Sequence, residues 1–424
     1  MKRALHILIL AISILAAVSC NKEEMKYSGT YKDVFIYYGV GFNNLSSSLK
    51  TNLKELSAGQ LPALSADRAI VAYIHSTATS GDYTTENSPR LIQYYTKNGV
   101  VVADTVKTYS ASTVSASSQT LRQVLSDVNS LYPSESYGFL LSSHGTGWLP
   151  SQVVYYKNYS LLSADADEES DNTPLPRGFG RRQWSPDPTL PETKTISAQY
   201  YKSSSNTSEI ELDDFADTFP MKMKYIILDA CLCGGVEVAY QLKDVCDYLI
   251  ASPTETLTSG LVRYTDLPAR LFSGSKPDLE GICKDFYDYT MSRSGDYQSG
   301  TVTLVDCSKL QSLASFCKTF YGNHRDEVDS VDRGSVQKYF YDSKAWFYDL
   351  RDLIAHSGAS GTELGELDTI LSSCIPYHAE TDTFFSLSLD RCCGLSTYIP
   401  YASQTQVNDH YKSLSWNSAT DYLE

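Results

Sequence analysis

Two residues with the chemistry of a catalytic pair follow two apolar segments of the sequence. His144 comes after the apolar run Tyr137–Ser142, and Cys231 comes after the run Met223–Ala230. Short continuous apolar runs of this kind predict buried strands. Functional groups collect at the carboxyl ends of strands in open parallel sheets. If neighbouring strands carry the two residues, the imidazole and the thiol face the same crevice.

An imidazole beside a thiol suits nucleophilic catalysis. The thiolate is the nucleophile, and a nearby histidine removes the thiol proton or passes a proton to the leaving group. A helix is expected to begin at Gly234–Gly235, where its dipole favours the thiolate. The backbone amides of Gly145 and Cys231 could hold a tetrahedral oxyanion. Spacing alone leaves two simpler readings open, a buried structural cysteine and a surface histidine in a glycine turn.

The elements that must position these residues alternate along the chain. Strands are expected at 33–40, 68–75, 137–142, 223–230 and 247–252, and helices at 88–99, 117–133 and 234–242. Ser117 or Ser118 is a plausible cap for the second helix, and Pro133 follows it. Helices between most strands predict parallel pairing in an α/β sheet.

The rest of the chain is divided by composition. Residues 151–206 form an irregular stretch rich in Pro, Asp and Ser, and an insert of this length is either functional or disordered. We assign 33–320 to one core containing this insert and 321–424 to a smaller, mostly helical C-terminal subdomain. The net charge of −15 argues against a nucleic-acid partner, because phosphate binding needs clustered Lys and Arg.

The N-terminus has the layout of a secretory signal. Lys2 and Arg3 precede the apolar stretch Ile7–Val18, and Cys20 follows small residues. This pattern predicts a lipoprotein signal peptide at 1–19, a tether at 20–32 and a lipid on Cys20 that anchors an extracytoplasmic protein to a bacterial membrane. The charged residues after Cys20 resemble the tether that sends some lipoproteins to the outer surface. A plain signal peptide cut nearby is the alternative.

Several segments of the sequence resemble those of a known protein family. The segments YPSESYGFLLSSHGTGW (132–148) and YIILDACLCGGVEVAYQL (225–242) resemble the two catalytic blocks of the clostripain family of cysteine peptidases. Further segments at 34–49, 301–313, 345–354 and 394–401 resemble others of that family in the same order. The resemblance covers most of the mature chain. It implies a caspase-like α/β fold with a mostly parallel sheet flanked by helices.

The resemblance also implies roles for single residues. His144 matches the catalytic histidine and Cys231 the nucleophile, and Gly145 matches the glycine whose amide completes the oxyanion hole with that of Cys231. Asp229 matches an aspartate at the base of the specificity pocket, which implies peptide substrates cut after Arg or Lys. Alternatively, Asp229 bonds local backbone amides. Cys233 stands where relatives usually have Met, and it could be idle or form a disulfide that silences Cys231.

Family enzymes are often activated by cutting themselves between the two catalytic blocks, after a basic residue. Here 87 residues (231 − 144) separate His144 from Cys231, and the insert between them offers Arg177, Arg181 and Arg182 as cleavage sites. A solvated loop with a basic patch is the alternative. Some relatives need calcium and others do not, so this cofactor stays open. The rival function is a surface-binding lipoprotein that kept the fold and lost catalysis.

Overall fold

The computed structural model describes residues 25–79, 82, 85, 87–150, 210–340 and 345–424. Its centre is a nine-stranded mixed sheet. In spatial order the strands are β10 (Tyr377–Glu380), β8 (Thr301–Asp306), β7 (Cys246–Ala251), β6 (Met223–Asp229), β5 (Tyr137–Ser142), β1 (Asp33–Gly41), β2 (Arg68–Ser76), β3 (Arg90–Lys97) and β4 (Val100–Thr108). The five central strands, β7 to β2, run parallel to one another, and antiparallel strands flank them at both edges. The predicted α/β class is confirmed.

Residues 88–99 do not form the predicted helix. They form β3, which turns into β4 through Asn98 and Gly99, both at positive φ (53° and 77°). Asn-Gly is the preferred pair for a tight hairpin turn, because both positions need the left-handed conformation. The apolar residues at 91, 92, 94 and 95 fit a helical spacing, but in the sheet they are buried on both faces of one strand. The helix prediction was wrong because it gave the Asn-Gly signal no weight.

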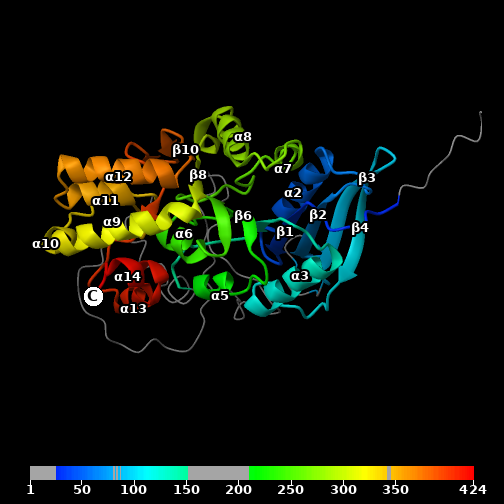
Figure 1. Cartoon of the computed structure of the whole chain (residues 1–424), viewed down its shortest axis with the longest axis horizontal. Coiled ribbons are helices and arrows are strands. Elements are labelled where there is room, and N and C mark those ends of the chain that lie inside the picture. Colours follow the sequence, from blue (N-terminus) through cyan, green and yellow to red (C-terminus); the bar gives the residue numbers. More distant parts are fainter. Residues whose placement is uncertain (1–24, 80–81, 83–84, 86, 151–209, 341–344) are drawn as a thin grey trace, which may run out of the picture.

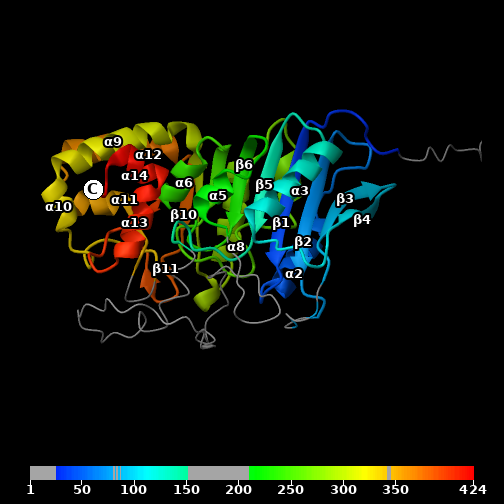
Figure 2. The same cartoon turned by 90° about the horizontal axis from the view of Figure 1, so that it is seen from below.

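Helices cover both faces of the sheet (Figures 1 and 2). One face carries α2 (Ser46–Ala58), α7 (Leu267–Phe272) and α8 (Leu279–Met291), and the other α3 (Ser118–Leu131), α5 (Leu212–Ala216), α6 (Val236–Leu242) and α9 (Leu310–Asn323). Alternate residues of each strand enter the two layers. In β1, Phe35 and Tyr37 pack in the first layer and Ile36 and Tyr38 in the second. Burial on both faces explains why the central strands are continuously apolar.

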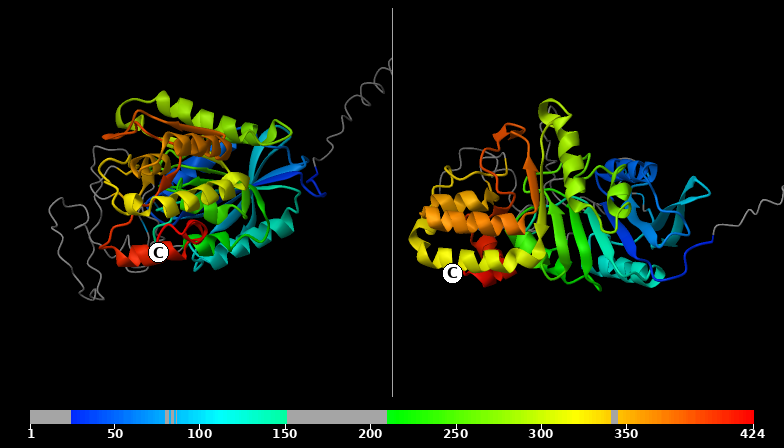
Figure 3. Two further views of the ribbon diagram at one scale, coloured as in Figure 1. Left: turned by 60° about the vertical axis from the view of Figure 1, so that its left-hand side comes forward. Right: turned by 45° about the horizontal axis from the view of Figure 1, so that its top comes forward.

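The C-terminal part packs against the second layer, beyond the β10 edge of the sheet (Figure 3). Its elements are α10 (Arg325–Asp329), β9 (Tyr348–Asp349), α11 (Leu350–His356), α12 (Gly361–Cys374), β11 (Thr383–Phe384), β12 (Leu387–Ser388), β13 (Ser396–Thr397), α13 (Thr405–Ser413) and α14 (Ser415–Thr420). Trp416 of α14 shares one apolar cluster with Val236 of α6. The predicted boundary at residue 320 lies within α9, and the division into a core and a subdomain stays a prediction.

Several predictions fall on residues outside the described ranges. These are the signal peptide at 1–19, the lipid on Cys20, the structure of the insert at 151–206, and the cleavage sites Arg177, Arg181 and Arg182. Among the helices that the structure does describe, none is both long and apolar enough to cross a membrane.

Candidate active site

The two candidate catalytic residues leave the sheet side by side. Strands β5 and β6 are parallel neighbours, and Ser142 of β5 stands opposite Asp229 of β6. The Ser142 hydroxyl donates a hydrogen bond of 2.7 Å to the Asp229 carboxylate, which fixes this register. His144 and Cys231 each follow two residues later, at the same carboxyl edge. The sheet therefore delivers His144 and Cys231 from adjacent strands, which is the condition that the sequence analysis left open.

The loops that carry the two residues touch through their backbones. A methyl group on Gly145 would lie 2.8 Å from Cβ of Ala230 and 3.1 Å from the carbonyl oxygen of Cys231. Gly147 has φ +62°, and a side chain there would overlap the carbonyl of Leu232. Only glycine permits so close an approach at these positions. The glycines around His144 therefore hold its loop against the Cys231 loop.

His144 is held by an asparagine from the loop after a third strand. Its side chain is buried, and its Nε2 lies 2.7 Å from Oδ1 of Asn44, in the loop that follows β1. An amide oxygen only accepts hydrogen bonds, so this contact assigns the proton of the neutral ring to Nε2 and leaves Nδ1 as the basic nitrogen. Asn44 was not among the site residues predicted from the sequence. The available signal was a polar Asn-Asn pair directly after a buried strand.

Cys231 is fully buried, and a backbone amide points at its sulfur. The N–H of Thr256 donates to Sγ at 3.0 Å, and Sγ lies 3.5 Å from the carbonyl oxygen of Thr256. An N–H donor favours a negatively charged sulfur. Helix α6 begins at Val236, five residues beyond Cys231, whereas a helix dipole acts within about one turn. The backbone N–H that points at the Cys231 sulfur is therefore that of Thr256, which follows β7, and not one from the first turn of α6.

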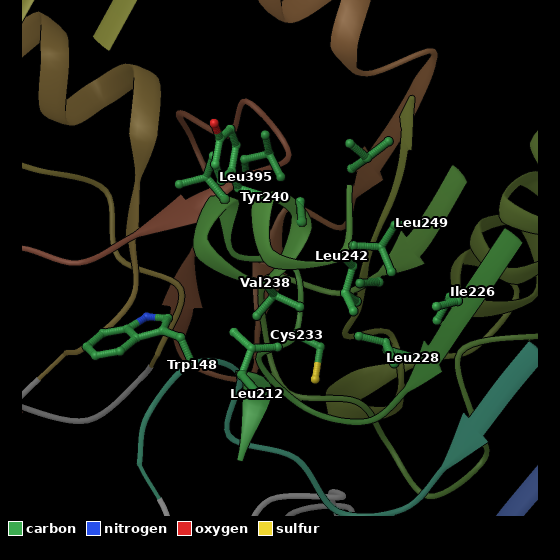
Figure 4. Packing of buried hydrophobic residues seen from close by; sticks show 14 of the residues in the cluster. Trp148, Leu212, Ile226, Leu228, Cys233, Val238, Tyr240, Leu242, Leu249 and Leu395 are labelled. Atoms are coloured by element: carbon green, nitrogen blue, oxygen red, sulfur yellow. The ribbon is translucent and has the colours of Figure 1, made fainter. Parts of the chain in front are cut away.

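Cys233 is not a competing nucleophile. Burial raises the pKa of its thiol to about 12, and its Sγ donates to the carbonyl oxygen of Cys231 at 3.3 Å. Figure 4 shows it among buried apolar side chains, with Leu228 and Val238 nearby. All nine cysteines in the described part of the chain, Cys231 and Cys233 among them, are free thiols. The described structure therefore contains no bond that blocks Cys231.

Asp229 is fully buried and accepts three hydrogen bonds from the protein itself. Leu261 N–H donates at 2.7 Å, Tyr264 hydroxyl at 2.5 Å and the Ser142 hydroxyl at 2.7 Å. Both carboxylate oxygens thus have internal donors, which agrees with the local-bonding alternative for this residue. The role of Asp229 in substrate selection stays a prediction.

The helix that follows Cys231 is tied to the C-terminal part of the chain. Glu237, in the first turn of α6, is fully buried. Its Oε1 accepts hydrogen bonds from the hydroxyl of Thr397 at 2.8 Å, the N–H of Tyr398 at 3.1 Å and the hydroxyl of Tyr411 at 2.7 Å. Burial raises the pKa of the Glu237 carboxyl. These contacts fix the position of α6 and so the end of the Cys231 loop.

A calcium site is not evident in the described residues. Within them, no group of three or more His, Cys, Asp or Glu side chains lies close enough together to hold a metal ion.

Comparison with known proteins agrees with this architecture. A search of curated sequences finds no significant match. The family model for the clostripain family (Peptidase_C11) matches residues 182–369, which include Asp229 and Cys231 but not His144.

Solved structures match over nearly the whole chain. An inactive zymogen C11 protease from Parabacteroides distasonis is 24% identical, with a TM-score of 0.71 over 93% of this chain and 99% of that one. A secreted C11 cysteine protease from Bacteroides thetaiotaomicron, iotapain, is 23% identical, with a TM-score of 0.70 over 93% and 100%. A complex of a secreted C11 cysteine protease from the same organism with an irreversible peptide inhibitor is 21% identical, with a TM-score of 0.69 over 93% and 100%. These structures share the fold, and the sequence match spans the segment that carries Cys231. The chain is therefore similar in sequence to the clostripain family over residues 182–369, and it shares the fold of these C11 protease structures.

Proposed function

We propose that this peptidase cleaves peptide bonds after Arg or Lys, with Cys231 as nucleophile and His144 as proton carrier. The observation that supports it is the register of β5 and β6, since Ser142 opposite Asp229 brings the loops of His144 and Cys231 out at the same edge of the sheet. The close contact of Gly145 with Ala230 and Cys231 adds to it.

Each residue has a defined task in the proposed reaction. His144 takes the thiol proton at Nδ1, and the Cys231 sulfur attacks the substrate carbonyl carbon. The amides of Gly145 and Cys231 donate to the oxyanion that forms. His144 then protonates the leaving amine, so the C–N bond breaks and a thioester remains. Water, deprotonated by His144, hydrolyses the thioester, while Asn44 keeps the ring oriented throughout.

The basic preference rests on a carboxylate near the nucleophile. Asp229 precedes Cys231 by two residues, and a carboxylate pairs with Arg in two-pronged geometry or with Lys as a point charge. Under the same proposal the enzyme is secreted and anchored through a lipid on Cys20. It is made latent and activated by cleavage after Arg177, Arg181 or Arg182. The full burial of Cys231 fits a latent form, and one structure of the same fold is an inactive zymogen.

The test compares the wild type with Cys231→Ala and His144→Ala on fluorogenic peptides ending in Arg, Lys, Asp or Asn. Assays are run in reducing buffer, before and after mild trypsin treatment that is stopped with a trypsin inhibitor. Cys392→Ala serves as a matched control, because this thiol is only partly buried and lies in the C-terminal part. We expect cleavage after Arg or Lys in the wild type and the control, and none in the other two variants.

Other outcomes overturn defined parts of the proposal. Cleavage only after Asp or Asn keeps the two catalytic residues and overturns the basic preference. Undiminished activity in Cys231→Ala overturns the assignment of the nucleophile. Failure to cleave any peptide, with or without trypsin, favours the binding lipoprotein. Fragment sequencing of active protein tests self-cleavage, because a fully active intact chain excludes it.

A further inference from the structure

The loop that carries His144 ends at a buried tryptophan, Trp148, which is held by the C-terminal part of the chain. The ring centroid of Trp148 lies 4.8 Å from that of Tyr398 and 5.0 Å from that of Tyr411. Nε2 of His410 donates a hydrogen bond of 3.1 Å to the carbonyl oxygen of Trp148. These contacts fix the end of the His144 loop against α13 and the segment after β13.

The same part of the chain holds the loop after β6, which carries the proposed nucleophile. The N–H of Ser396 donates to the carbonyl oxygen of Gly234 at 3.0 Å. Directly after this loop, Glu237 of α6 accepts hydrogen bonds from the N–H of Tyr398 at 3.1 Å and from the hydroxyl of Tyr411 at 2.7 Å. Tyr398 and Tyr411 therefore contact both the end of the His144 loop and the helix that follows the Cys231 loop.

The two tyrosines are fully buried and pack on each other, with ring centroids 5.3 Å apart. Protein interiors are close-packed, so a buried ring cannot shift without moving the groups that it touches. Trp148 and Glu237 lie on different loops, and Tyr411 touches both of them. The separation of the two loops therefore depends on this tyrosine and on Tyr398 beside it.

That separation matters for the proposed reaction. His144 must take the proton of the Cys231 thiol and later deliver a proton to the leaving amine, and both transfers need hydrogen-bond reach. A displacement of about 1 Å, even from a change far from the reacting atoms, lowers the rate by about 100-fold.

We propose that Tyr411, with Tyr398 beside it, is a positioning residue of the peptidase. It sets the distance between His144 and Cys231 by holding Trp148 with its ring and Glu237 with its hydroxyl. The inference rests on the proposed function and deepens it, because it makes the C-terminal part of the chain a component of the catalytic apparatus. A tyrosine that only filled the core would affect stability alone.

The first test measures kcat and KM for the Arg-ending peptide, under the assay conditions given above. Active sites are counted by titration with an irreversible thiol-reactive peptide, so unfolded molecules do not enter kcat. Tyr411→Leu removes both contacts, and we expect kcat per active site to fall by about 100-fold with little change in KM. Tyr411→Phe keeps the ring against Trp148 and leaves Glu237 its other donors, so it should stay within about tenfold of the wild type.

Tyr73→Leu is the matched control for Tyr411→Leu. Tyr73 is a fully buried tyrosine on β2, with its ring 4.6 Å from that of Tyr38 and its hydroxyl 2.6 Å from Oγ of Ser115. The same chemical change at this position should lower the free energy of unfolding and leave kcat per active site at the wild-type value. Equal falls of kcat per active site in Tyr411→Leu and Tyr73→Leu overturn the inference.

A second variant covers misfolding of Tyr411→Leu. His410 is only partly buried, and His410→Ala removes its hydrogen bond to Trp148. We expect kcat per active site to fall by about 2- to 12-fold, the loss of one neutral hydrogen bond. His324→Ala is its control, because His324 is also partly buried and has its own contact, at 2.9 Å to Glu363. A wild-type kcat in His410→Ala, when Tyr411→Leu is unfolded, overturns the inference.

Hydrogen exchange of the backbone amides tests the positioning without a substrate. In folded Tyr411→Leu, peptides covering 143–150 and 231–237 should both exchange at least about tenfold faster than in the wild type, whereas Tyr73→Leu should leave both unchanged. Faster exchange in only one of these peptides, or in neither, overturns the inference. A wild type that cleaves no peptide overturns the proposed function, and hydrogen exchange then decides by itself whether Tyr411 holds both loops.

Discussion

Replacing Asn44 should change catalysis and leave the fold intact. Asn44 is exposed, so Asn44→Ala should alter the free energy of unfolding by no more than about 0.5 kcal/mol. The variant removes the 2.7 Å hydrogen bond to Nε2 of His144. A neutral hydrogen bond contributes about 0.5–1.5 kcal/mol, which corresponds to a roughly 2- to 12-fold fall in kcat/KM if that contribution is lost in the transition state.

Asn44→Asp tests the same contact in the opposite direction. A carboxylate acceptor strengthens the bond to protonated His144 by about 1–1.5 kcal/mol, because charge-assisted hydrogen bonds are about twice as strong as neutral ones. One pKa unit corresponds to about 1.4 kcal/mol, so the pKa of His144 should rise by about one unit. The limb of the pH–rate profile that His144 governs should then move up by the same amount.

The assay is kcat/KM for an Arg-ending fluorogenic peptide between pH 5 and 9, with urea unfolding in parallel. Asn323→Ala, an exposed asparagine at the end of α9, is the control for a generic Asn-to-Ala change. Wild-type kinetics in Asn44→Ala, together with an unshifted profile in Asn44→Asp, would refute the idea that Asn44 sets the tautomer and orientation of His144.

Three further predictions concern the surroundings of the nucleophile. Gly145→Ala should lower kcat/KM at least about tenfold, because the methyl group would push the His144 loop away from Ala230. The free energy of unfolding should change much less. Equal effects on kcat/KM and on the free energy of unfolding would contradict this. Cys233→Ala should keep its activity, because a thiol with a pKa of about 12 is ionised in only about one molecule in 10⁴ at pH 8. Loss of turnover in a folded Cys233→Ala variant would contradict this prediction. Burial raises the pKa of the Glu237 carboxyl, so the native state keeps the carboxyl proton to higher pH than the unfolded state does. The free energy of unfolding should therefore fall as the pH rises from about 4.5 through the raised pKa. Urea titrations across this window should show that slope in the wild type and lose it in Glu237→Gln; the same slope in both would assign it to another group.

Much of the sheet could be predicted from the sequence, because the central strands are buried on both faces and therefore read as continuous apolar runs. The same property misled the prediction at residues 88–99. Leu91, Ile92, Tyr94 and Tyr95 are all buried in one strand, and their spacing equally fits a helix face. Only the Asn-Gly turn that follows distinguishes the two.

Some residues of the candidate site could be predicted from the sequence and others could not. His144 and Cys231 stand directly after apolar runs, so the strands themselves point to them. Asn44 and Thr256 lie in loops after β1 and β7 and carry no periodic pattern. What brings them to the site is the order of the strands, with β1 beside β5 and β7 beside β6. The order of the strands is a property of the assembled sheet, so it cannot be predicted from any one local segment of the sequence.

The contacts of Glu237 have a consequence for the making of the protein. Its partner Tyr411 lies 174 positions further along the chain. At about 5–20 residues per second, a ribosome needs roughly 9 to 35 s to reach Tyr411 after it has made Glu237. During that interval Glu237 of α6 lacks hydrogen-bond partners that have not yet been synthesised. The three hydrogen bonds that hold α6 through Glu237 can therefore form only after most of the chain has been made.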